Sequence, residues 1–260
     1  MKAIVNDAQI ESFQRDGFVV VPGLIERTVV DEWKRQVQRE LGVETEDAIA
    51  KSVQARWPAS DGTSVLQNFR FRDGFDFHRV EGVVAAIDQF GGGNFSPREG
   101  DSNPHVLWPV PTDRWQVATS GHVDGYAGSR WFSFMIGATT YLHGVGPREG
   151  GTFLWPGSHI DNWLYYRAHP DAVGNGEDEA RDTAFQQRAR KRTPVEAVMD
   201  AGDVLFWHHN LYHSPSKNIG QRPRWGFFIR CHHNREAEIR HEAPEDLWRF
   251  WGSAGPHPES

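Results

Sequence analysis

Cysteine is nearly absent from this sequence, which has one, Cys231, among its 260 residues. A single cysteine excludes any disulfide within the chain and is typical of proteins in a reducing compartment. Basic charge is also in short supply, because 28 lysines and arginines stand against 35 acidic residues. The net charge of −7 argues against nucleic-acid binding, which usually needs a basic surface.

Long hydrophobic runs are missing as well. The longest apolar stretch, GFVVVPGLI at 17–25, is far shorter than the roughly 20 residues that a membrane-spanning helix needs. The first residues, MKAIVNDAQIESF, lack the apolar segment of a secretory signal peptide. We therefore expect a soluble cytoplasmic protein that binds neither membranes nor nucleic acid.

The first third of the sequence carries helical patterns. DAQIESFQRDG begins at Asp7, a residue type that caps helices, and ends at Gly17. The next segment, GFVVVPGLI, is typical of a β-strand closed by a Pro-Gly turn. A second helix is predicted by apolar residues at helical spacing before a glycine: Val30, Trp33, Val37, Leu41 and Gly42. Glycine, serine, asparagine and proline crowd 90–104, which predicts a loop.

From about residue 106 the pattern changes to short β-rich runs separated by turn residues, which is typical of a sandwich or a barrel. These runs are RWQVATSGHVD, RWFSFMIGATTYL, GGTFLWPGSH, GDVLFWHH and PRWGFFIRCHH. One further helix is predicted within 175–194, acidic at its start and basic at its end. We expect a single domain over 1–260, with a helical part at about 1–105, a β-rich core at about 106–235 and an insertion at about 160–195.

The segment GHVDGY places an imidazole and a carboxylate two positions apart, at His122 and Asp124. In a strand, side chains two apart share a face, so these two groups make half of a metal site. A 2-His-1-carboxylate iron site needs one more imidazole. The segment AGDVLFWHHNLYHS offers three candidates, namely His208, His209 and His213. Arg224 follows the last of them and opens another strand-like run.

The order of these motifs resembles the phytanoyl-CoA dioxygenase family of iron(II)/2-oxoglutarate-dependent oxygenases. The matching segments are RDGFVVVPGLI, GHVDGY, GGTFLWPGSH, AGDVLFWHHNLYHS and RPRWGFF, which together span residues 10–235 approximately. The resemblance implies a mainly β fold, with a double-stranded β-helix (jelly-roll, cupin-like) core and N-terminal and flanking helices. It also implies Fe(II), 2-oxoglutarate and O2 as cofactor and co-substrates.

The same resemblance implies roles for individual residues. His122, Asp124 and His213 match the family's iron ligands, and Arg224 matches the residue that binds the distal carboxylate of 2-oxoglutarate. Thr140 matches a strand position that faces the co-substrate.

Two further points concern the neighbours of these residues. Ser214-Pro215 stands where the family often has Gly-Ser, which leaves open whether Ser214 or Ser216 contacts 2-oxoglutarate. Tyr126 and Arg130 follow the metal motif closely, so we expect them near the substrate.

The expected function is oxidation of a small molecule with release of succinate and CO2. The substrate class favoured is a polar secondary metabolite or a sugar-containing natural product. Hydroxylation is the default outcome, with desaturation and oxidative ring closure as variants. Two alternatives stay open: a jelly-roll that binds a ligand without turnover, and a cupin-type metalloenzyme that does not use 2-oxoglutarate. The sequence does not indicate an oligomeric state.

Overall fold

The structure is a computed structural model, and it describes most of the chain with gaps. The described residues are 3–44, 66–68, 75–97, 102, 104–110, 114–119, 121–123, 135–170, 187, 191–239 and 243–252. Among these residues, none of the helices has both the length and the apolar character needed to cross a membrane. The helix predicted within 175–194 lies almost entirely outside the described residues.

The described elements alternate between short helices and strands. The helices are α1 (Asp7–Asp16), α2 (Arg27–Leu41), the 3-10 helix η1 (Asp76–Arg79), α4 (Glu81–Gly91), α5 (Ser158–Ala168) and α7 (Glu236–Ile239). The strands are β1 (Phe18–Val21), β2 (Leu66–Asn68), β3 (Phe95–Pro97), β4 (Pro104–Leu107), β5 (Met135–Tyr141), β6 (Thr152–Leu154), β7 (Val195–Glu196), β8 (Val204–His208), β9 (His213–Pro215) and β10 (Arg224–His233).

The residue that caps the first helix lies one position earlier than the sequence suggested. Asn6, rather than Asp7, is the cap: its side chain accepts from the Gln9 backbone N–H at 3.0 Å. The Gln9 side chain accepts in return from the Asn6 N–H at 2.9 Å, which completes a capping box. Gly17 ends the helix in the left-handed region at φ 83°, as predicted. This pair of caps fixes where the chain turns into β1.

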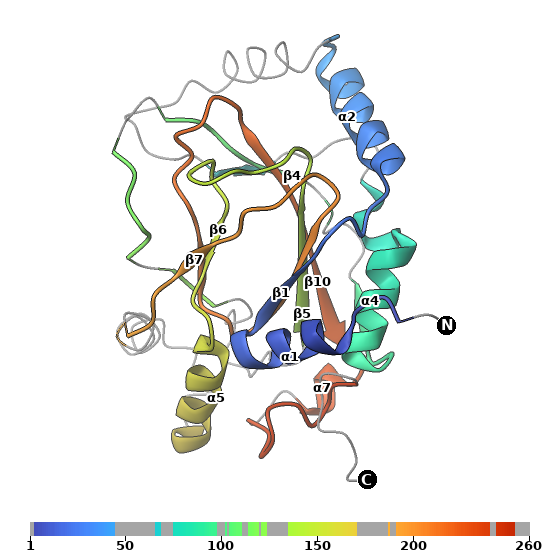
Figure 1. The fold of residues 1–260 in the computed structure, drawn as a ribbon. Coiled ribbons are helices and arrows are strands. Elements are labelled where there is room, and N and C mark those ends of the chain that lie inside the picture. The colour runs from blue at the N-terminus through green and yellow to red at the C-terminus, as the bar shows by residue number, and fades with distance from the viewer. Residues whose placement is uncertain are drawn as a thin grey trace.

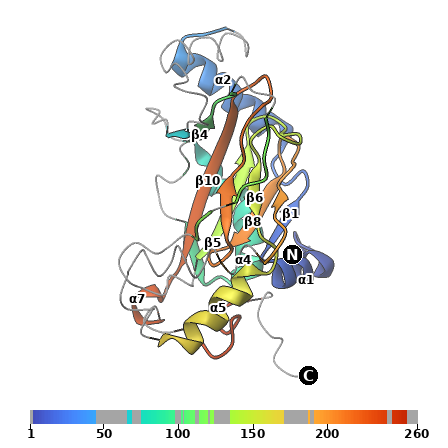
Figure 2. The ribbon, with the colours of Figure 1, turned by 90° about the vertical axis from the view of Figure 1, so that its left-hand side faces the viewer.

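The β-strands form two antiparallel sheets that face each other (Figures 1 and 2). In the described part of the chain, the larger sheet has the order β1-β8-β5-β10-β4-β2, and β3 pairs with the far end of β10. The smaller sheet has the order β7-β6-β9. This arrangement agrees with the predicted mainly β fold with flanking helices.

Strands from the N-terminal part take part in the larger sheet. β1 pairs with β8 along its whole length, from Phe18 opposite Trp207 to Val21 opposite Val204. The predicted loop at 90–104 is wrong in part, because β3 lies within it and pairs with β10. Helix α4, which precedes β3, was not predicted. The helical part and the β-rich part are therefore not separate units, and the boundary near residue 106 does not divide the sheet.

The two faces of the larger sheet are buried by different partners. Helices α1, α2 and α4 pack on one face, where Phe13, Trp33 and Phe90 join a single apolar cluster with Phe206 and Phe227 of the sheet. The other face turns toward the smaller sheet and holds a second cluster, which includes Tyr141, Leu154, Leu205, Trp207 and Leu211. Alternation along each strand separates the two clusters. The space between the sheets is where a cavity can form.

Helices close the two ends of this sandwich. Helix α2 lies at one end of the molecule, and α5 and α7 lie at the other (Figures 1 and 2). Helix α5 begins two residues before the segment expected as an insertion at 160–195, runs into it, and is fixed by an ion pair. Arg192 Nη2 donates to Asp161 at 2.9 Å, and its Nη1 donates to the Pro156 carbonyl at 2.8 Å.

Candidate active site

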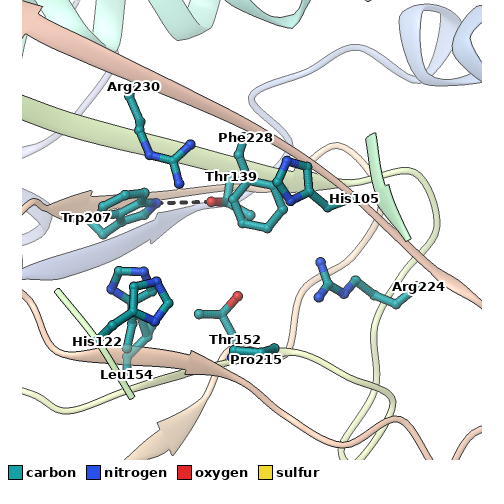
Figure 3. A pocket seen from close by; sticks show the side chains of 11 residues that line it. His105, His122, Thr139, Thr152, Leu154, Trp207, Pro215, Arg224, Phe228 and Arg230 are labelled. Carbon is teal, nitrogen blue, oxygen red and sulfur yellow. Dashed lines mark hydrogen bonds between the residues drawn. The ribbon is translucent and has the colours of Figure 1, made fainter. Parts of the chain in front are cut away.

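A cavity of about 230 Å³ lies between the two sheets. Thr139, Trp207, Arg224, Phe228 and Arg230 line it from the larger sheet. From the facing side it is lined by Thr152, Leu154, His213 and Pro215, together with His122 (Figure 3). His105 of β4 completes the described wall. The cavity therefore collects polar groups from strands that are far apart in the sequence.

Two imidazoles come together at one end of this cavity. His122 and His213 form an antiparallel bridge, in which the His122 N–H donates to the His213 carbonyl at 2.8 Å. The reverse bond, from the His213 N–H to the His122 carbonyl, measures 2.9 Å. The centroids of the two rings are 4.4 Å apart. Two of the three expected iron ligands are thus neighbours, although 90 residues separate them.

The residues beside the two histidines make this close approach possible. A Cβ on Gly121 would meet the His213 carbonyl group, so only glycine fits between the two segments. The Gly121 N–H donates to the Tyr212 hydroxyl at 2.8 Å. Tyr212 in turn is fixed because its N–H donates to the Ser158 hydroxyl at 2.9 Å. The segment with His122 is therefore tied to β9 by backbone bonds and to the preceding residue, Tyr212, by a side-chain bond.

The ring of His213 is oriented by its own backbone neighbour. Its Nδ1 lies 2.9 Å from the Leu211 carbonyl, which can only accept, so Nδ1 carries the proton. The neutral ring then has its lone pair on Nε2. A backbone carbonyl that fixes the tautomer in this way is typical of metal-binding histidines.

Three of the predicted site residues cannot be placed. Asp124, Tyr126 and Arg130 lie outside the described residues. Accordingly, the described part of the chain contains no group of three histidine, cysteine or acidic side chains able to hold a metal. The expected third ligand, Asp124, follows His122 by two positions. The described backbone ends at Val123, directly before it.

Arg224 lies at the other end of the cavity from His122 (Figure 3). It is 4% exposed, and neither its Nε nor its Nη1 has a hydrogen-bond partner among the described residues. The guanidinium carbon lies 5.3 Å from the Tyr141 ring centroid and 5.8 Å from that of Phe228. Burial lowers the pKa of this guanidinium. A buried cation without oxygen partners is costly unless an anion completes it.

Space for the Arg224 guanidinium comes from a glycine two residues along the strand. A Cβ on Gly226 would collide with Arg224 Nη1 and would also press on the Phe228 ring. Arg224, Gly226 and Phe228 share one face of β10, because alternate residues of a strand point to the same side. The Arg224 guanidinium therefore packs directly against the backbone of Gly226.

The structure corrects the position expected for Thr140. Its hydroxyl donates to the Asp203 carbonyl at 2.8 Å, and the side chain is fully buried away from the cavity wall. The preceding residue, Thr139, lines the cavity instead and accepts from Trp207 Nε1 at 3.0 Å (Figure 3). Adjacent strand residues point to opposite faces, so the expectation was off by one position.

The two serines after His213 also point elsewhere. The Ser216 hydroxyl donates to Glu196 at 2.6 Å, and the Ser214 hydroxyl donates to the Pro215 carbonyl at 3.2 Å. Among the described residues that line the cavity, neither serine is present, whereas Pro215 is. Where the family often has Gly-Ser, this chain has Ser214-Pro215, and Pro215 forms part of the cavity wall.

The other two histidine candidates lie away from the cavity. His208 is fully buried, accepts from the Asn210 N–H at 3.1 Å through Nδ1, and stacks on Trp251 with 5.0 Å between centroids. Its ring centroid is 4.2 Å from that of His209. Burial, and then the neighbouring histidines His209 and His159, hold the pKa of His208 well below its usual value. His213 is the candidate that shares the cavity with His122.

Several lining residues were not singled out from the sequence, among them Thr139, Trp207, Arg230 and His105. Alternation along β10 was the available signal for Arg230, because that residue continues the series of Arg224, Gly226 and Phe228. Trp207 would have followed from pairing β8 with β5, which no local pattern indicates.

The two cavity imidazoles and Arg224 fit an iron(II)/2-oxoglutarate site. Ferrous iron is held by two imidazoles together with a carboxylate, for which Asp124 is the residue expected from the sequence, and this set leaves open positions on the metal. A planar guanidinium suits the two oxygens of a carboxylate. The orphaned Nε and Nη1 of Arg224 are the structural sign that such an anion belongs at that end of the cavity.

Solved structures with the same fold include two enzymes of nogalamycin biosynthesis. The epimerase SnoN from nogalamycin biosynthesis, solved with Fe3+, alpha ketoglutarate and nogalamycin RO, has a TM-score of 0.57 at 20% identity, covering 87% of this chain and 83% of SnoN. The carbocyclase SnoK from the same biosynthesis has a TM-score of 0.58 at 16% identity, covering 88% and 84%. HygX from Streptomyces hygroscopicus, solved with nickel and 2-oxoglutarate, has a TM-score of 0.52 at 15% identity, covering 88% and 87%.

These identities are low, so the likenesses to solved structures establish the fold. No curated protein sequence matches this chain. The sequence model of phytanoyl-CoA dioxygenase (PhyH), by contrast, matches residues 13–226, which include both cavity histidines and Arg224. The chain therefore belongs to the phytanoyl-CoA dioxygenase family of iron(II)/2-oxoglutarate-dependent oxygenases.

Proposed function

We propose that His122, Asp124 and His213 hold the ferrous ion, and that Arg224 binds the distal carboxylate of 2-oxoglutarate. The substrate is a small polar secondary metabolite or a sugar-containing natural product. The protein acts in the cytoplasm, a reducing compartment, which suits a chain whose single cysteine, Cys231, is buried and free.

One observation carries this proposal: a buried, unsatisfied guanidinium and a pair of touching imidazoles occupy opposite ends of one cavity. Leaving a charged group buried without hydrogen bonds costs several kcal/mol. Arg224 is such a group, and Gly226 makes room for its guanidinium. A ligand that carries a carboxylate and reaches toward the histidines removes the cost, as 2-oxoglutarate does.

The residues of the cavity then perform distinct tasks. With 2-oxoglutarate and oxygen, the bound iron supplies the oxidising power that removes hydrogen from substrate, and succinate and CO2 are released. Arg224 orients the co-substrate by a two-pronged bond. The Leu211 carbonyl holds the His213 ring in its ligating tautomer. Trp207, Leu154 and Phe228 provide apolar walls that keep water away from the reacting atoms.

The outcome for substrate is hydroxylation, or oxidative desaturation or ring closure. SnoN, an epimerase, and SnoK, a carbocyclase, share the fold and support outcomes other than simple hydroxylation. The carboxylate at Asp124 argues against halogenation, because a halide needs that coordination position.

The first test is spectroscopic and needs no substrate. Anaerobic protein with ferrous iron and 2-oxoglutarate should develop a weak visible charge-transfer band. The variant Arg224→Gln should weaken 2-oxoglutarate binding by about 10- to 100-fold, because a charge-assisted bond contributes roughly 1.5–3 kcal/mol. Arg222→Gln, which removes the same charge from an exposed position, is the matched control.

Two results would contradict the proposal. A wild-type protein without the band would favour a jelly-roll that binds a ligand without turnover. Substrate oxidation that proceeds equally well in Arg224→Gln would favour a metalloenzyme independent of 2-oxoglutarate.

A further inference from the structure

A pair of hydroxyl groups, from Thr152 and Tyr141, lies at the Arg224 end of the cavity, and the roles assigned above do not use it. Thr152 of β6 lines the cavity, and the ring of Tyr141 of β5 lies 5.3 Å from the Arg224 guanidinium carbon. In Figure 3, Thr152 lies between His122 and Arg224, with its hydroxyl oxygen on the side of Arg224. The two hydroxyl oxygens are 3.0 Å apart. The pair therefore stands beside the guanidinium that is proposed to bind 2-oxoglutarate.

The direction of the hydrogen bond between the two hydroxyls follows from counting protons. Tyr141 is 1% exposed, and its oxygen already accepts from the Thr152 N–H at 3.0 Å. The phenol proton needs an acceptor, and among the described residues that acceptor is Thr152 Oγ1. A bond in the opposite direction would leave the phenol proton buried and unpaired, which is costly. Tyr141 therefore donates to Thr152, and the hydroxyl proton of Thr152 is left for a different acceptor.

The neighbours of Thr152 direct this proton to the cavity. Thr152 is 7% exposed and forms part of the cavity wall. Its cross-strand partner on β9 is Pro215, which offers the wall no hydroxyl. Ser214 and Ser216, on either side of that proline, bond to groups outside the cavity. Thr152 thus supplies, from the opposite strand, the hydroxyl that neither serine brings to this wall.

A hydroxyl donor beside Arg224 suits a carboxylate. An ionised carboxylate has about four lone-pair positions, and a bidentate guanidinium fills roughly two of them. A hydroxyl that donates to one of the others makes a charge-assisted bond, which is stronger than a bond between neutral groups. Among the described residues that line the cavity, none is acidic. An anion at this end would therefore meet donors and no competing carboxylate from the described wall.

We propose that Thr152 binds the co-substrate: its hydroxyl, which accepts from Tyr141, donates to the distal carboxylate of 2-oxoglutarate beside Arg224. Tyr141 is then a positioning residue, because it touches the co-substrate only through Thr152. This inference rests on the proposed function, since it takes Arg224 as the residue that binds the same carboxylate.

Two keto acids test the contact. 2-Oxopentanoate has the carbon chain of 2-oxoglutarate but a methyl group in place of the distal carboxylate. Dissociation constants of both acids are measured on the anaerobic ferrous protein from the charge-transfer band. Thr152→Val, which replaces the hydroxyl by a methyl group, should weaken 2-oxoglutarate binding about tenfold or more. It should change the constant of 2-oxopentanoate by less than about twofold, because that acid cannot accept the bond.

Two further variants serve as controls. Thr152→Ser keeps the hydroxyl and should bind 2-oxoglutarate within about threefold of wild type. Thr140→Val also removes a buried hydroxyl, but one that donates to the Asp203 carbonyl away from the cavity. Its two constants should stay within about twofold of wild type, so a general effect of losing a buried hydrogen bond is accounted for.

Tyr141→Phe tests the positioning role. Without the phenol proton, the Thr152 hydroxyl loses the donor that orients it, so 2-oxoglutarate should bind more weakly. The double variant Tyr141→Phe/Thr152→Val should bind 2-oxoglutarate within about twofold of the more weakly binding single variant, because both changes act through one hydroxyl.

Three results would overturn the inference. An unchanged 2-oxoglutarate constant in Thr152→Val would remove Thr152 from the co-substrate site, and an equal loss for both keto acids would reduce its role to a structural one. Additive losses in the double variant would show that Tyr141 does not act through Thr152. A missing charge-transfer band in wild type with 2-oxoglutarate would instead refute the proposed function, so the two failures are distinguishable.

Discussion

At the scale of single residues, the site depends on side chains that are absent as much as on those present. Gly121 lets two backbone segments touch, Gly137 makes room for an indole, and Gly226 makes room for a guanidinium. None of these three has a positive φ, so each is explained by space and not by backbone conformation. A cavity wall built this way tolerates no added methyl group.

Gly226→Ala should therefore impair 2-oxoglutarate binding without affecting the metal. The new methyl group would displace Arg224 Nη1, and overpacking of this kind costs about 1–3 kcal/mol. We expect the dissociation constant of 2-oxoglutarate to rise about tenfold or more in the anaerobic titration. Gly144→Ala is the control, because its added carbon meets only ordinary contacts, the nearest at 3.5 Å. Equal constants for Gly226→Ala and wild type would argue against a role for Arg224 in binding.

The sequence predicted the residues of the site better than their surroundings. His122, His213 and Arg224 were found because their spacing matches a family, and the structure brings all three to one cavity. Thr139 was missed in favour of Thr140, since a one-residue error in a buried strand leaves no trace in hydrophobicity. Arg230 and Trp207 were missed because their place in the cavity wall depends on cross-strand pairing, which is not visible along one strand.

At the scale of elements, the metal end of the cavity is a junction between β9 and the segment that carries His122. Two backbone bonds and the Tyr212 hydroxyl hold this junction. Among the described residues the junction is a single bridge between His122 and His213, and β9 is three residues long. Its geometry is therefore more sensitive to a single side chain than a longer ladder would be.

Tyr212→Phe should lower metal affinity while leaving the cavity arginines in place. Loss of the hydroxyl leaves the Gly121 N–H without its acceptor, which costs about 1–3 kcal/mol where the group stays buried. Supporting groups of this kind typically change metal affinity by about 10- to 100-fold. Titration of the apoprotein with Co(II), followed by its visible spectrum, measures the effect. Tyr165→Phe on α5 serves as control, and an unchanged Co(II) affinity in Tyr212→Phe would refute the role.

A buried histidine joins α1 to α5 and should make stability depend on pH. His159 Nε2 donates to the Gln14 carbonyl in the last turn of α1, and burial lowers the pKa of His159 to about 4. In the unfolded chain this histidine takes up a proton near pH 6.5, a much higher pH than in the folded protein. Stability from this residue is thus complete above about pH 6.5 and is lost as the pH falls toward 4, by on the order of 3 kcal/mol.

Urea unfolding at several pH values between 7.5 and 4.5 measures this effect. His159→Gln keeps an N–H donor but cannot be protonated, so its stability should fall less steeply over that range. His208 acts in the same direction, because burial lowers its pKa as well, so part of the dependence should remain. The exposed His169 provides the control variant His169→Gln. Parallel curves for wild type and His159→Gln would contradict the assignment.

Helix boundaries in the N-terminal part were predictable because caps are local signals. Gly17 and Gly42 end α1 and α2 as expected, with φ of 83° and 65°. The apolar residues of α2 that were expected to be buried are buried: Val30, Trp33, Val37 and Leu41. Strand β3 was not predictable, since Phe95–Pro97 owes its extended form to pairing with the distant β10. Glycines around it suggested a loop for good local reasons.

At the scale of the whole molecule, the cavity lies between two sheets that also form the core. Ligands that bridge the sheets should therefore stabilise the entire fold. With metal bound, 2-oxoglutarate at 100 times its dissociation constant should raise the free energy of unfolding by about 2.7 kcal/mol. Thermal unfolding under anaerobic conditions measures this as a rise in midpoint. Arg224→Gln at the same 2-oxoglutarate concentration should show little of it, and an equal rise in both proteins would contradict a site at Arg224.

The pairing of β1 with β8 has a consequence for how the protein is made. Phe18–Val21 cannot find its partner until Val204–His208 has left the ribosome, so an apolar strand stays uncovered during most of synthesis. The nascent chain thus exposes an apolar, aggregation-prone strand early and buries it late. Chaperone binding at this strand would protect the chain from aggregation during synthesis.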